Sequence, residues 1–314
     1  MRMGRLFLSL LLLLLAAPLA AQQKTSTFGP RGDHVITGPA QSVDIITPHI
    51  TDSHELELPY LGEVQLPRWA PVHIGGVELD LSPTKHVIML LIAALLCLTV
   101  LIPAAMSNER QTAHKGHAKG FAGAVESIVL FIRNEVVLPN VGHHGDAFVP
   151  FAMTLFFFIL FANLLGLIPY GSTATGNLSV TATLAITTFF VIEIAGMRAL
   201  GKSYWRTIVY WPPDQSLAIK LPMTFIMTPI EIIGKLTKPF ALAIRLFANM
   251  TAGHVVLLAL ISLIFTFGSY WIVLPPLLMG VAISMLELFV ALLQAYIFTL
   301  LASVFIGLIR ESAH

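Results

Sequence analysis

Residues 235–256 read KLTKPFALAIRLFANMTAGHVV, an apolar stretch with helical spacing that carries Arg245 in its interior. An arginine at the centre of a membrane helix costs about 2.5–3.5 kcal/mol on insertion scales, so it usually pairs with a group or performs a function. Asn249 lies one turn further along the same face. Small residues on this face would let another helix approach the cation: Ala241, Ala248 and Ala252. The alternative is an arginine near a helix end whose side chain reaches the membrane interface.

The composition indicates an integral membrane protein. Of the 314 residues, 56% are hydrophobic and 11% are charged, whereas soluble domains carry about 25% charged residues. The formal net charge of +1 argues against nucleic acid as a partner. Cys97 is the single cysteine, which excludes an internal disulfide and a thiolate metal centre. We expect neither a metal nor a cofactor.

The chain before the membrane domain divides into two segments. Residues 1–22 place two arginines before a leucine run and small residues, which is typical of a secretory signal peptide; an uncleaved anchor helix is the alternative. Residues 23–82 are polar and rich in proline, and short pieces such as Gly75–Leu81 could be strands. We therefore expect an extracytoplasmic extension followed by a membrane domain over residues 83–314.

Three spans of ordinary length are expected in the first half of the membrane domain. Each is long enough to cross a hydrocarbon core of about 30 Å, and the three cover His86–Met106, Phe148–Tyr170 and Leu178–Met197. The basic loop Ser107–Gly120 is predicted to be cytoplasmic and the uncharged loop Gly171–Asn177 to be external. Residues Phe121–Leu138 favour an amphipathic helix on the inner surface. Glu193 lies near a span end, where it could reach water in a structural role.

Two much longer apolar stretches complete the chain after a polar re-entry at Tyr204–Lys220. Leu221–Phe267 and Tyr270–Ile309 meet at Gly268-Ser269, which predicts a hairpin. One helix over the second stretch would be about 60 Å long, so it must be tilted, kinked or broken. Pro275-Pro276 is expected to help break its start. The positive residues before and after the hairpin place the C-terminus in the cytoplasm.

Antiparallel geometry matches the polar residues of this hairpin in depth. A turn near residue 270 sets Arg245 beside Gln294 and His254 beside Glu287. Nine residues separate Arg245 from His254, so the two occupy opposite sides of their helix. Histidine and glutamate can exchange protons near neutral pH, whereas arginine remains a fixed charge. The hairpin therefore offers a fixed cation on one face and a titratable pair on another.

Less specific roles remain open for several residues. His254 could be a core histidine bonded to a backbone carbonyl, and Gln294 could join two helices. Glu231, fourteen residues before Arg245, serves either as an interface charge or in proton access. Asn163 and Asn177 are expected to cap helices or satisfy backbone groups. The cluster His143–Asp146 is interpreted as a solvated loop.

The sequence resembles a known family from about Lys85 to its C-terminus. Residues 239–254, PFALAIRLFANMTAGH, are similar to the signature of subunit a of F-type ATP synthases, as are Asn163–Pro169 and Gln294–Phe298. The segment 1–82 is longer than the common family pattern. In many relatives an acid occupies the position of His254 and a histidine that of Glu287, so the pair is exchanged here. We take the exchange as support for contact between them.

The resemblance implies an all-α integral membrane protein with about five transmembrane helices after the signal-like segment, the last two forming a tilted hairpin against a ring of c subunits. It implies a non-catalytic stator subunit of a proton-translocating ATP synthase, with Arg245 facing the c-ring carboxylates. Further partners would be the b subunits of the peripheral stalk and the rest of the F1F0 complex. The proton-translocation residues would be Glu231, Arg245, Asn249, His254, Glu287 and Gln294. We expect the protein in a bacterial inner membrane, with its N-terminal region outside.

Two other classes of membrane protein were weighed against this interpretation. A secondary transporter would hold a substrate at mid-membrane on broken helices and would carry an inverted repeat, which the sequence does not display. An intramembrane hydrolase would need a nucleophile or a metal-binding set; neither a GxSxG nor an HExxH motif occurs.

Overall fold

The computed structural model describes residues 51–311, with short gaps at 59–61, 70, 75–76, 81, 116–119, 143–144, 169–172, 212–215 and 268–269. The signal-like segment 1–22, residues 23–50 and the predicted turn at Gly268-Ser269 therefore lie outside the described residues. Predictions about cleavage and about the turn stay predictions.

The described chain is dominated by helices, in agreement with the predicted all-α membrane fold. The helical elements are α3 (Lys85–Lys115), α4 (Phe121–Phe131), the π-helical turn η2 (Ile132–Val137), α5 (Leu138–Val141), η3 (Gly145–Phe148), α6 (Val149–Gly166), η4 (Ala174–Gly176), α7 (Leu178–Leu200), η5 (Gly201–Thr207), α8 (Leu217–Phe267) and α9 (Tyr270–Glu311). Five of these regions are long and apolar enough to cross a membrane, and they contain α3, α6, α7, α8 and α9.

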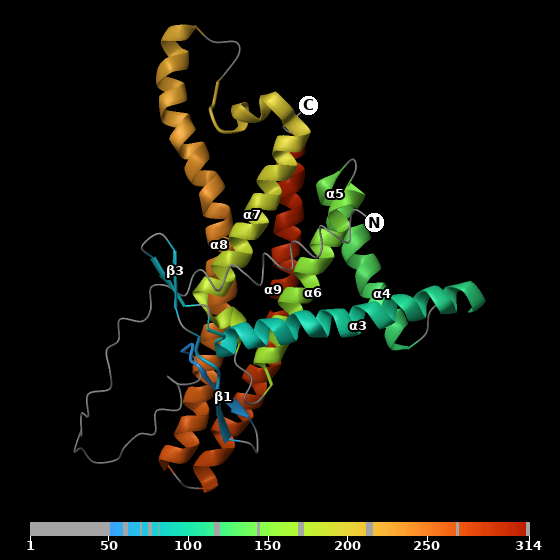
Figure 1. Cartoon of the computed structure of the whole chain (residues 1–314), viewed down its shortest axis with the longest axis vertical. Coiled ribbons are helices and arrows are strands. Elements are labelled where there is room, and N and C mark those ends of the chain that lie inside the picture. The colour runs from blue at the N-terminus through green and yellow to red at the C-terminus, as the bar shows by residue number, and fades with distance from the viewer. Residues whose placement is uncertain are drawn as a thin grey trace, which may run out of the picture.

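Helices α8 and α9 run side by side in opposite directions along the longest axis of the molecule, and α6 and α7 pack against them (Figure 1). The core between these helices combines large apolar side chains with alanines. Phe298, Leu246 and Ile159 are fully buried in one cluster with Ala295 of α9, and Ala291 of the same helix is also buried. In a membrane the hydrophobic effect does not drive helices together, because lipid tails are as apolar as the side chains. Small residues let the helix backbones approach closely and gain packing contacts instead.

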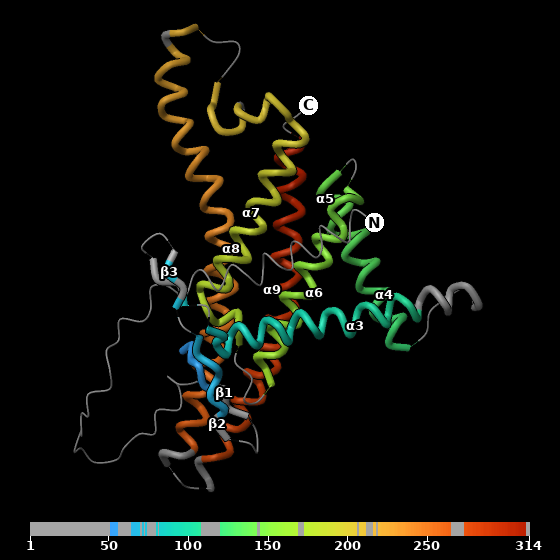
Figure 2. The backbone as a smooth tube through the Cα atoms, in the orientation of Figure 1, coloured from blue at the N-terminus to red at the C-terminus, as the bar shows by residue number. Residues whose placement is uncertain are grey.

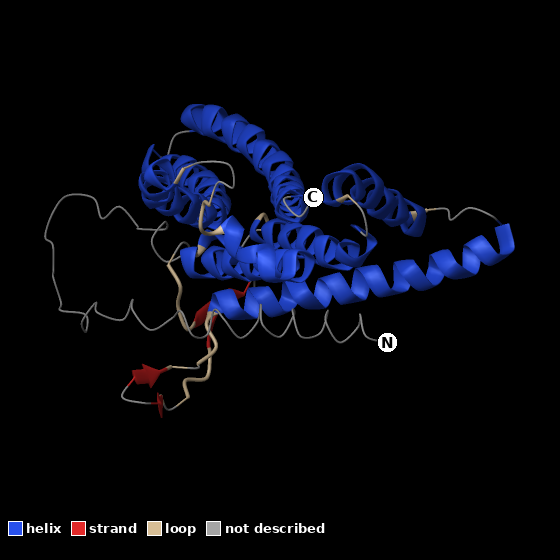
Figure 3. Ribbon diagram, turned by 90° about the horizontal axis from the view of Figure 1, so that it is seen from above, coloured by secondary structure: helices blue, strands red, loops and turns tan. Residues whose placement is uncertain are grey.

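Helix α3 crosses this bundle at a steep angle instead of joining it lengthwise, as the two perpendicular views show (Figures 1 and 3). At 1.5 Å per residue, α3 is about 46 Å long and α8 about 76 Å. Helices at such an angle cannot both follow the membrane normal. Because α8 far exceeds the thickness of the hydrocarbon core, its length agrees with the tilt predicted for the long hairpin.

Three local expectations were wrong. The first helix continues to Lys115, through most of the predicted loop Ser107–Gly120, because polar residues outside the hydrocarbon can still form helix. The segment Phe121–Leu138 does not lie wholly on a surface: its second half packs against α9, and Ile132, Val136 and Val137 are fully buried. These three apolar residues share one face of that half and give it a partner helix, while Asn134 and Glu135 stay exposed.

The expected break at Pro275-Pro276 does not occur either, since α9 is one helix from Tyr270 to Glu311. Helix α8 likewise continues through Pro222, Pro229 and Pro239. Membrane helices tolerate proline when neighbouring groups satisfy the freed carbonyls. With no break in either helix, tilt or bending stays the predicted way to fit these two lengths to a membrane.

The segment before α3 forms two small antiparallel hairpins near the start of that helix (Figure 2). Strand β1 (Glu55–Leu58) pairs with β2 (Gly62–Gln65), and β3 (Val72–Ile74) pairs with β4 (Val77–Leu79). Strand β4 falls within the predicted strand Gly75–Leu81. A backbone bond from Lys85 N–H to the carbonyl of Ser53 (3.0 Å) fastens this segment to the first turn of α3.

Candidate functional site

The predicted contact between the two long helices is present. Nδ1 of His254 on α8 lies 3.3 Å from Oε1 of Glu287 on α9. Both side chains are largely withdrawn from the surface, with 21% and 10% of their area exposed. An ion pair at such a depth is costly unless it is well partnered, so its other contacts decide what it can do.

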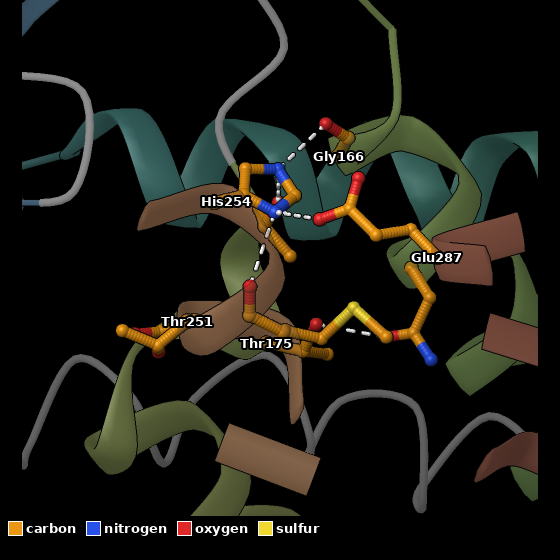
Figure 4. Close-up of polar contacts among 9 residues, drawn as sticks. Gly166, Thr175, Thr251, His254 and Glu287 are labelled. Carbon is orange, nitrogen blue, oxygen red and sulfur yellow. Dashed lines mark hydrogen bonds and ion pairs between the residues drawn. The ribbon is translucent and has the colours of Figure 1, made fainter. Parts of the chain in front are cut away.

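Oxygen atoms surround both ring nitrogens of His254 (Figure 4). The carbonyl of Met250 lies 3.1 Å from Nδ1, the carbonyl of Gly166 lies 2.9 Å from Nε2, and Thr173 Oγ1 lies 2.6 Å from Nε2. Carbonyls only accept hydrogen bonds, so a hydrogen on each nitrogen satisfies this site. The arrangement fits an imidazolium whose counter-charge is Glu287.

Gly253 makes room for this pair. A methyl group at this position would collide with the carboxylate of Glu287. Glycine is thus required because the α9 carboxylate passes directly over the α8 backbone.

We predict that Gly253→Ala displaces the Glu287 carboxylate and slows coupled proton transport by at least about tenfold, or ~1.4 kcal/mol. ATP-driven acidification of inverted vesicles measures the effect. Gly280→Ala on α9 is the matched control, because a methyl group there meets no atom within 4 Å. Equal transport rates for the two variants would contradict the requirement for glycine beside the Glu287 carboxylate.

Nearer the middle of α8, Asn249 and Gln294 form a second contact across the hairpin. Nδ2 of Asn249 donates to Oε1 of Gln294 at 3.2 Å. Gln294 is 2% exposed, and its Nε2 has no hydrogen-bond partner among the described residues. The expected pairing of Arg245 with Gln294 is corrected: Asn249, one helical turn further along the same face, bonds the glutamine instead. From the His254–Glu287 pair to this pair, α8 advances by five residues and α9 by seven, so the register shifts by two residues.

Arg245 lies on the exposed face of α8 and makes no hydrogen bond or ion pair with any described part of the chain. The small residues predicted to share its face are exposed as well: Ala241, Ala248 and Ala252. His254 points inward to α6 and α9, so the predicted separation of cation and titratable pair onto different faces is confirmed. A guanidinium on an open, small-residue face of an apolar helix is suited to a partner outside this chain.

A third polar cluster joins α7 to the first half of α8. Nζ of Lys235 lies 3.4 Å from Oε2 of Glu193, 3.0 Å from Thr207 Oγ1 and 4.9 Å from the ring centre of Tyr204. Glu193 is 13% exposed and forms a partly buried ion pair, which fits the structural role expected of it. Lys235, the partner of Glu193, lies one helical turn after Glu231 on α8.

Glu193, Thr207 and Lys235 line a cavity of about 620 Å³ between α7, α8 and α9. The cavity is also lined by Glu231, Lys238, Tyr210 and Phe305. Glu231 is exposed. A cavity of this volume, with carboxylates and hydroxyls on its wall, has room and partners for water.

We expect Lys235→Met to destabilise the subunit, because it leaves the Glu193 carboxylate buried without its cation. Breaking a fully buried pair costs about 3–5 kcal/mol, and the open cavity lowers that penalty. Thermal denaturation of the purified complex measures it. Lys238→Met, which removes a cation whose contact is the Phe305 ring at 4.8 Å, should have the smaller effect, and Glu193→Gln in the Lys235→Met background should restore stability.

The structure also adds residues that the sequence did not single out. Gly166 and Thr173 contact His254 from 88 and 81 positions away, and Lys235 binds Glu193. The predicted structural roles of two asparagines are confirmed: Asn177 Oδ1 caps α7 by accepting from Ser179 N–H (2.9 Å), and Asn163 Nδ2 donates to the backbone carbonyl of Ala291 (3.5 Å). Asn163 Oδ1 also accepts from the hydroxyl of Thr175 (2.7 Å).

Of the cluster His143–Asp146, the two histidines lie outside the described residues. Asp146, 70% exposed, pairs with Arg133 at 2.7 Å. Among the described residues, no three acidic, histidine or cysteine side chains converge as metal ligands would.

Comparison with known proteins identifies the family of this chain. Residues 87–307 match the family model described as ATP synthase A chain. Over 270 residues the chain is 44% identical to ATP synthase subunit a 2 of Chlorobaculum tepidum, covering 84% of this chain and 72% of that protein. It is 44% identical to ATP synthase subunit a of Chloroherpeton thalassium over 83% of this chain and 74% of the relative.

A longer match, 41% identity over 93% of this chain and 85% of the relative, is to ATP synthase subunit a 2 of Prosthecochloris aestuarii. The fold and the polar hairpin therefore define a multi-pass helical membrane protein. The chain belongs to the ATP synthase subunit a family.

Proposed function

We propose that this protein is the stator subunit of the F0 sector of an ATP synthase. It provides two proton half-channels and the arginine that couple transmembrane proton flow to rotation of a c-subunit ring, while catalysis occurs elsewhere in the complex. The observation that carries the proposal is Arg245, exposed without a partner from the described chain at the middle of a tilted, apolar hairpin.

The chemistry follows from the fixed charge of Arg245. A carboxylic acid of the ring loses its proton more readily beside a guanidinium, because the cation stabilises the carboxylate. The acid is therefore deprotonated as it reaches Arg245 and is reprotonated after it passes. Arginine cannot carry the proton itself, so it also keeps protons from crossing directly between the half-channels. Each proton that crosses 100 mV supplies about 2.3 kcal/mol.

Two polar clusters on either side of Arg245 are candidates for the half-channels. We assign the outer one to His254 and Glu287, continued by Asn249 and Gln294, and the inner one to the cavity that Glu231 lines. The distances between partners within the outer set, 3.3 and 3.2 Å, support proton exchange along it. The cavity volume supports access of water to the inner set.

The remaining partners and the orientation belong to the same proposal. The exposed face around Arg245 would contact the c-ring, and other surfaces would contact the b subunits of the peripheral stalk and membrane lipid. In this proposal the membrane is a bacterial inner membrane. The charge bias of the loops supports an orientation with the segment before α3 outside and the C-terminus in the cytoplasm.

Purification of the complex in mild detergent tests the proposal against a secondary transporter. We expect a small, very hydrophobic subunit bearing a membrane carboxylate to be isolated with this chain, and its modification by a carbodiimide to stop proton transport. A chain that is isolated alone and transports a solute without a ring would support the transporter class and overturn the proposal.

A further inference from the structure

His86, in the first turn of α3, is a buried histidine that the proposed mechanism does not use. Its side chain is 3% exposed, and it lies just before residues 87–307, where the family match begins. Nδ1 of His86 lies 3.1 Å from Oδ1 of Asp52 and 3.2 Å from Nδ2 of Asn177. The segment before α3 and the start of α7 thus meet on one ring nitrogen.

These two partners require opposite states of that nitrogen. Asp52 accepts hydrogen bonds, so it needs a hydrogen on Nδ1; the amide of Asn177 donates, so it needs a lone pair there. The alternative amide orientation is excluded because Asn177 Oδ1 already accepts from Ser179 N–H. His86 therefore has a partner when Nδ1 carries a hydrogen and another when it does not, which is what a group that repeatedly gains and loses a proton requires.

Charged groups and dipoles of both signs lie around His86. Burial raises the pKa of Asp52, but the hydrogen bond and charge of His86 outweigh it, and the pKa lies below its ordinary value of 3.8. Asp52 is then an anion at neutral pH and favours the imidazolium. The N-terminus of α7, whose cap is Asn177, and the buried neighbour Lys85 oppose it. His54 is the other titratable group nearby, bonded to the carbonyl of Pro83.

The turn η4 joins this cluster to the His254 site. Asn177 follows η4 and Thr173 precedes it, and the two bind His86 and His254 respectively. At about 2 Å per residue of 3₁₀ helix, the turn is roughly 8 Å long. Helix α3 packs against η4, and η4 packs against α8. Residues 173–180 contain no ionisable side chain, so nothing charged on this turn separates the two histidines.

Buried polar atoms continue from this cluster toward the middle of α8. Thr84, beside Asp52, lowers the pKa of that carboxyl through a side-chain hydrogen bond, and Glu287 Oε1 is held in the ion pair with His254. Gln294 Nε2, beside Asn249, has no hydrogen-bond partner among the described residues. A buried polar atom of this kind is normally satisfied by ordered water.

We propose that His86 is the proton carrier at the mouth of the outer half-channel, with Asp52 as the counter-ion of its charged form and Asn177 as the partner of its neutral form. The imidazole takes a proton from external water and becomes an imidazolium paired with Asp52. It then gives the Nδ1 proton to water on the side of Thr173 and His254. The neutral ring that remains has its lone pair on Nδ1 and accepts from Asn177 there. The inference rests on the proposed function and extends its outer path to the segment before α3.

This role is tested by passive proton flow through vesicles stripped of the catalytic sector. The flow is measured while the pH is varied over about pH 6 to 9 on the side of the membrane that the first turn of α3 faces. We expect His86→Gln to slow proton flow at least about fivefold and to remove the histidine-like step from the pH profile. Asp52→Asn should move that step to lower pH, because the imidazolium loses its anion, and Asp52→Glu should restore it. The control is His73→Gln, an exposed histidine of β3, which should match the unchanged protein.

Other outcomes separate the two proposals. An unchanged pH profile in His86→Gln and Asp52→Asn, with Glu287→Gln still blocking flow, would overturn the role of His86 and leave the proposed function standing. A uniform loss at every pH would assign His86 a structural role only. If Glu287→Gln also conducts normally, the proposed function itself fails. If His86→Gln does not assemble, Asp52→Asn tests the role instead. A shift of the step in the pH profile to lower pH supports the role of His86, and no shift or a shift to higher pH overturns it.

Discussion

Replacing Arg245 by alanine is expected to abolish ATP-driven acidification of inverted vesicles, by at least about 100-fold or ~2.7 kcal/mol. Without the guanidinium, nothing at this depth favours the ionised form of a ring carboxylate, so the proton is not released beside the hairpin. Assembly should survive, because Arg245 is exposed and makes no contact with the described chain that its loss could disrupt. The amount of subunit in the purified complex checks this.

Two further variants sharpen the result. Arg245→Lys should also lose most coupling, because lysine is a compact point charge that surrenders its proton when desolvated. Arg198→Ala, which removes an exposed arginine near the end of α7, should pump normally. Normal pumping by Arg245→Ala would mean that this arginine is an interfacial anchor, and the proposed role of the hairpin would fail with it.

The second large effect concerns the pair His254 and Glu287. His254→Ala and Glu287→Ala should each slow proton transport by at least about tenfold, because each leaves the other group buried without its partner. The exchanged double variant, His254→Glu with Glu287→His, should recover part of the rate. It keeps one acid and one base at two positions whose side chains lie 3.3 Å apart in the unchanged protein. Vesicle acidification at fixed ATP concentration measures all four proteins.

The recovery is expected to be partial for a geometric reason. His254 uses the carbonyls of Gly166 and Met250, and a glutamate moved to that position would face those acceptors without a hydrogen to offer. A double variant no faster than the single variants would contradict functional pairing, although the two side chains touch.

The hairpin was predictable from the sequence because helical geometry is regular. Counting residues from a turn near 270 brought His254 to Glu287, and the 100° step per residue separated Arg245 from His254. The same count failed to give the partner of Gln294, since the crossing of two long helices shifts the register by two residues between the two pairs. A single offset cannot describe helices that are not parallel.

Contacts that depend on tertiary placement were beyond the sequence. The carbonyl of Gly166 reaches His254 because α6 ends beside α8, and Lys235 reaches Glu193 because α7 and α8 diverge around a cavity. Neither contact follows from spacing along one helix. The steep angle of α3 and the insertion of the η2 turn into the bundle likewise depend on which surfaces pack, not on local hydrophobicity.

Disulfide cross-linking between the Arg245 face and the ring tests the central claim most directly. In a background with Cys97, the single native cysteine, changed to alanine, new cysteines replace the exposed Ala248 or Ala252, with the buried Ala243 as control. A partner cysteine is placed next to the c-subunit carboxylate. We predict oxidative cross-links from positions 248 and 252 and none from 243, because a disulfide needs Cα atoms within about 7 Å. Cross-links from position 243, or from no position in an assembled complex, would contradict the placement of Arg245 against the ring.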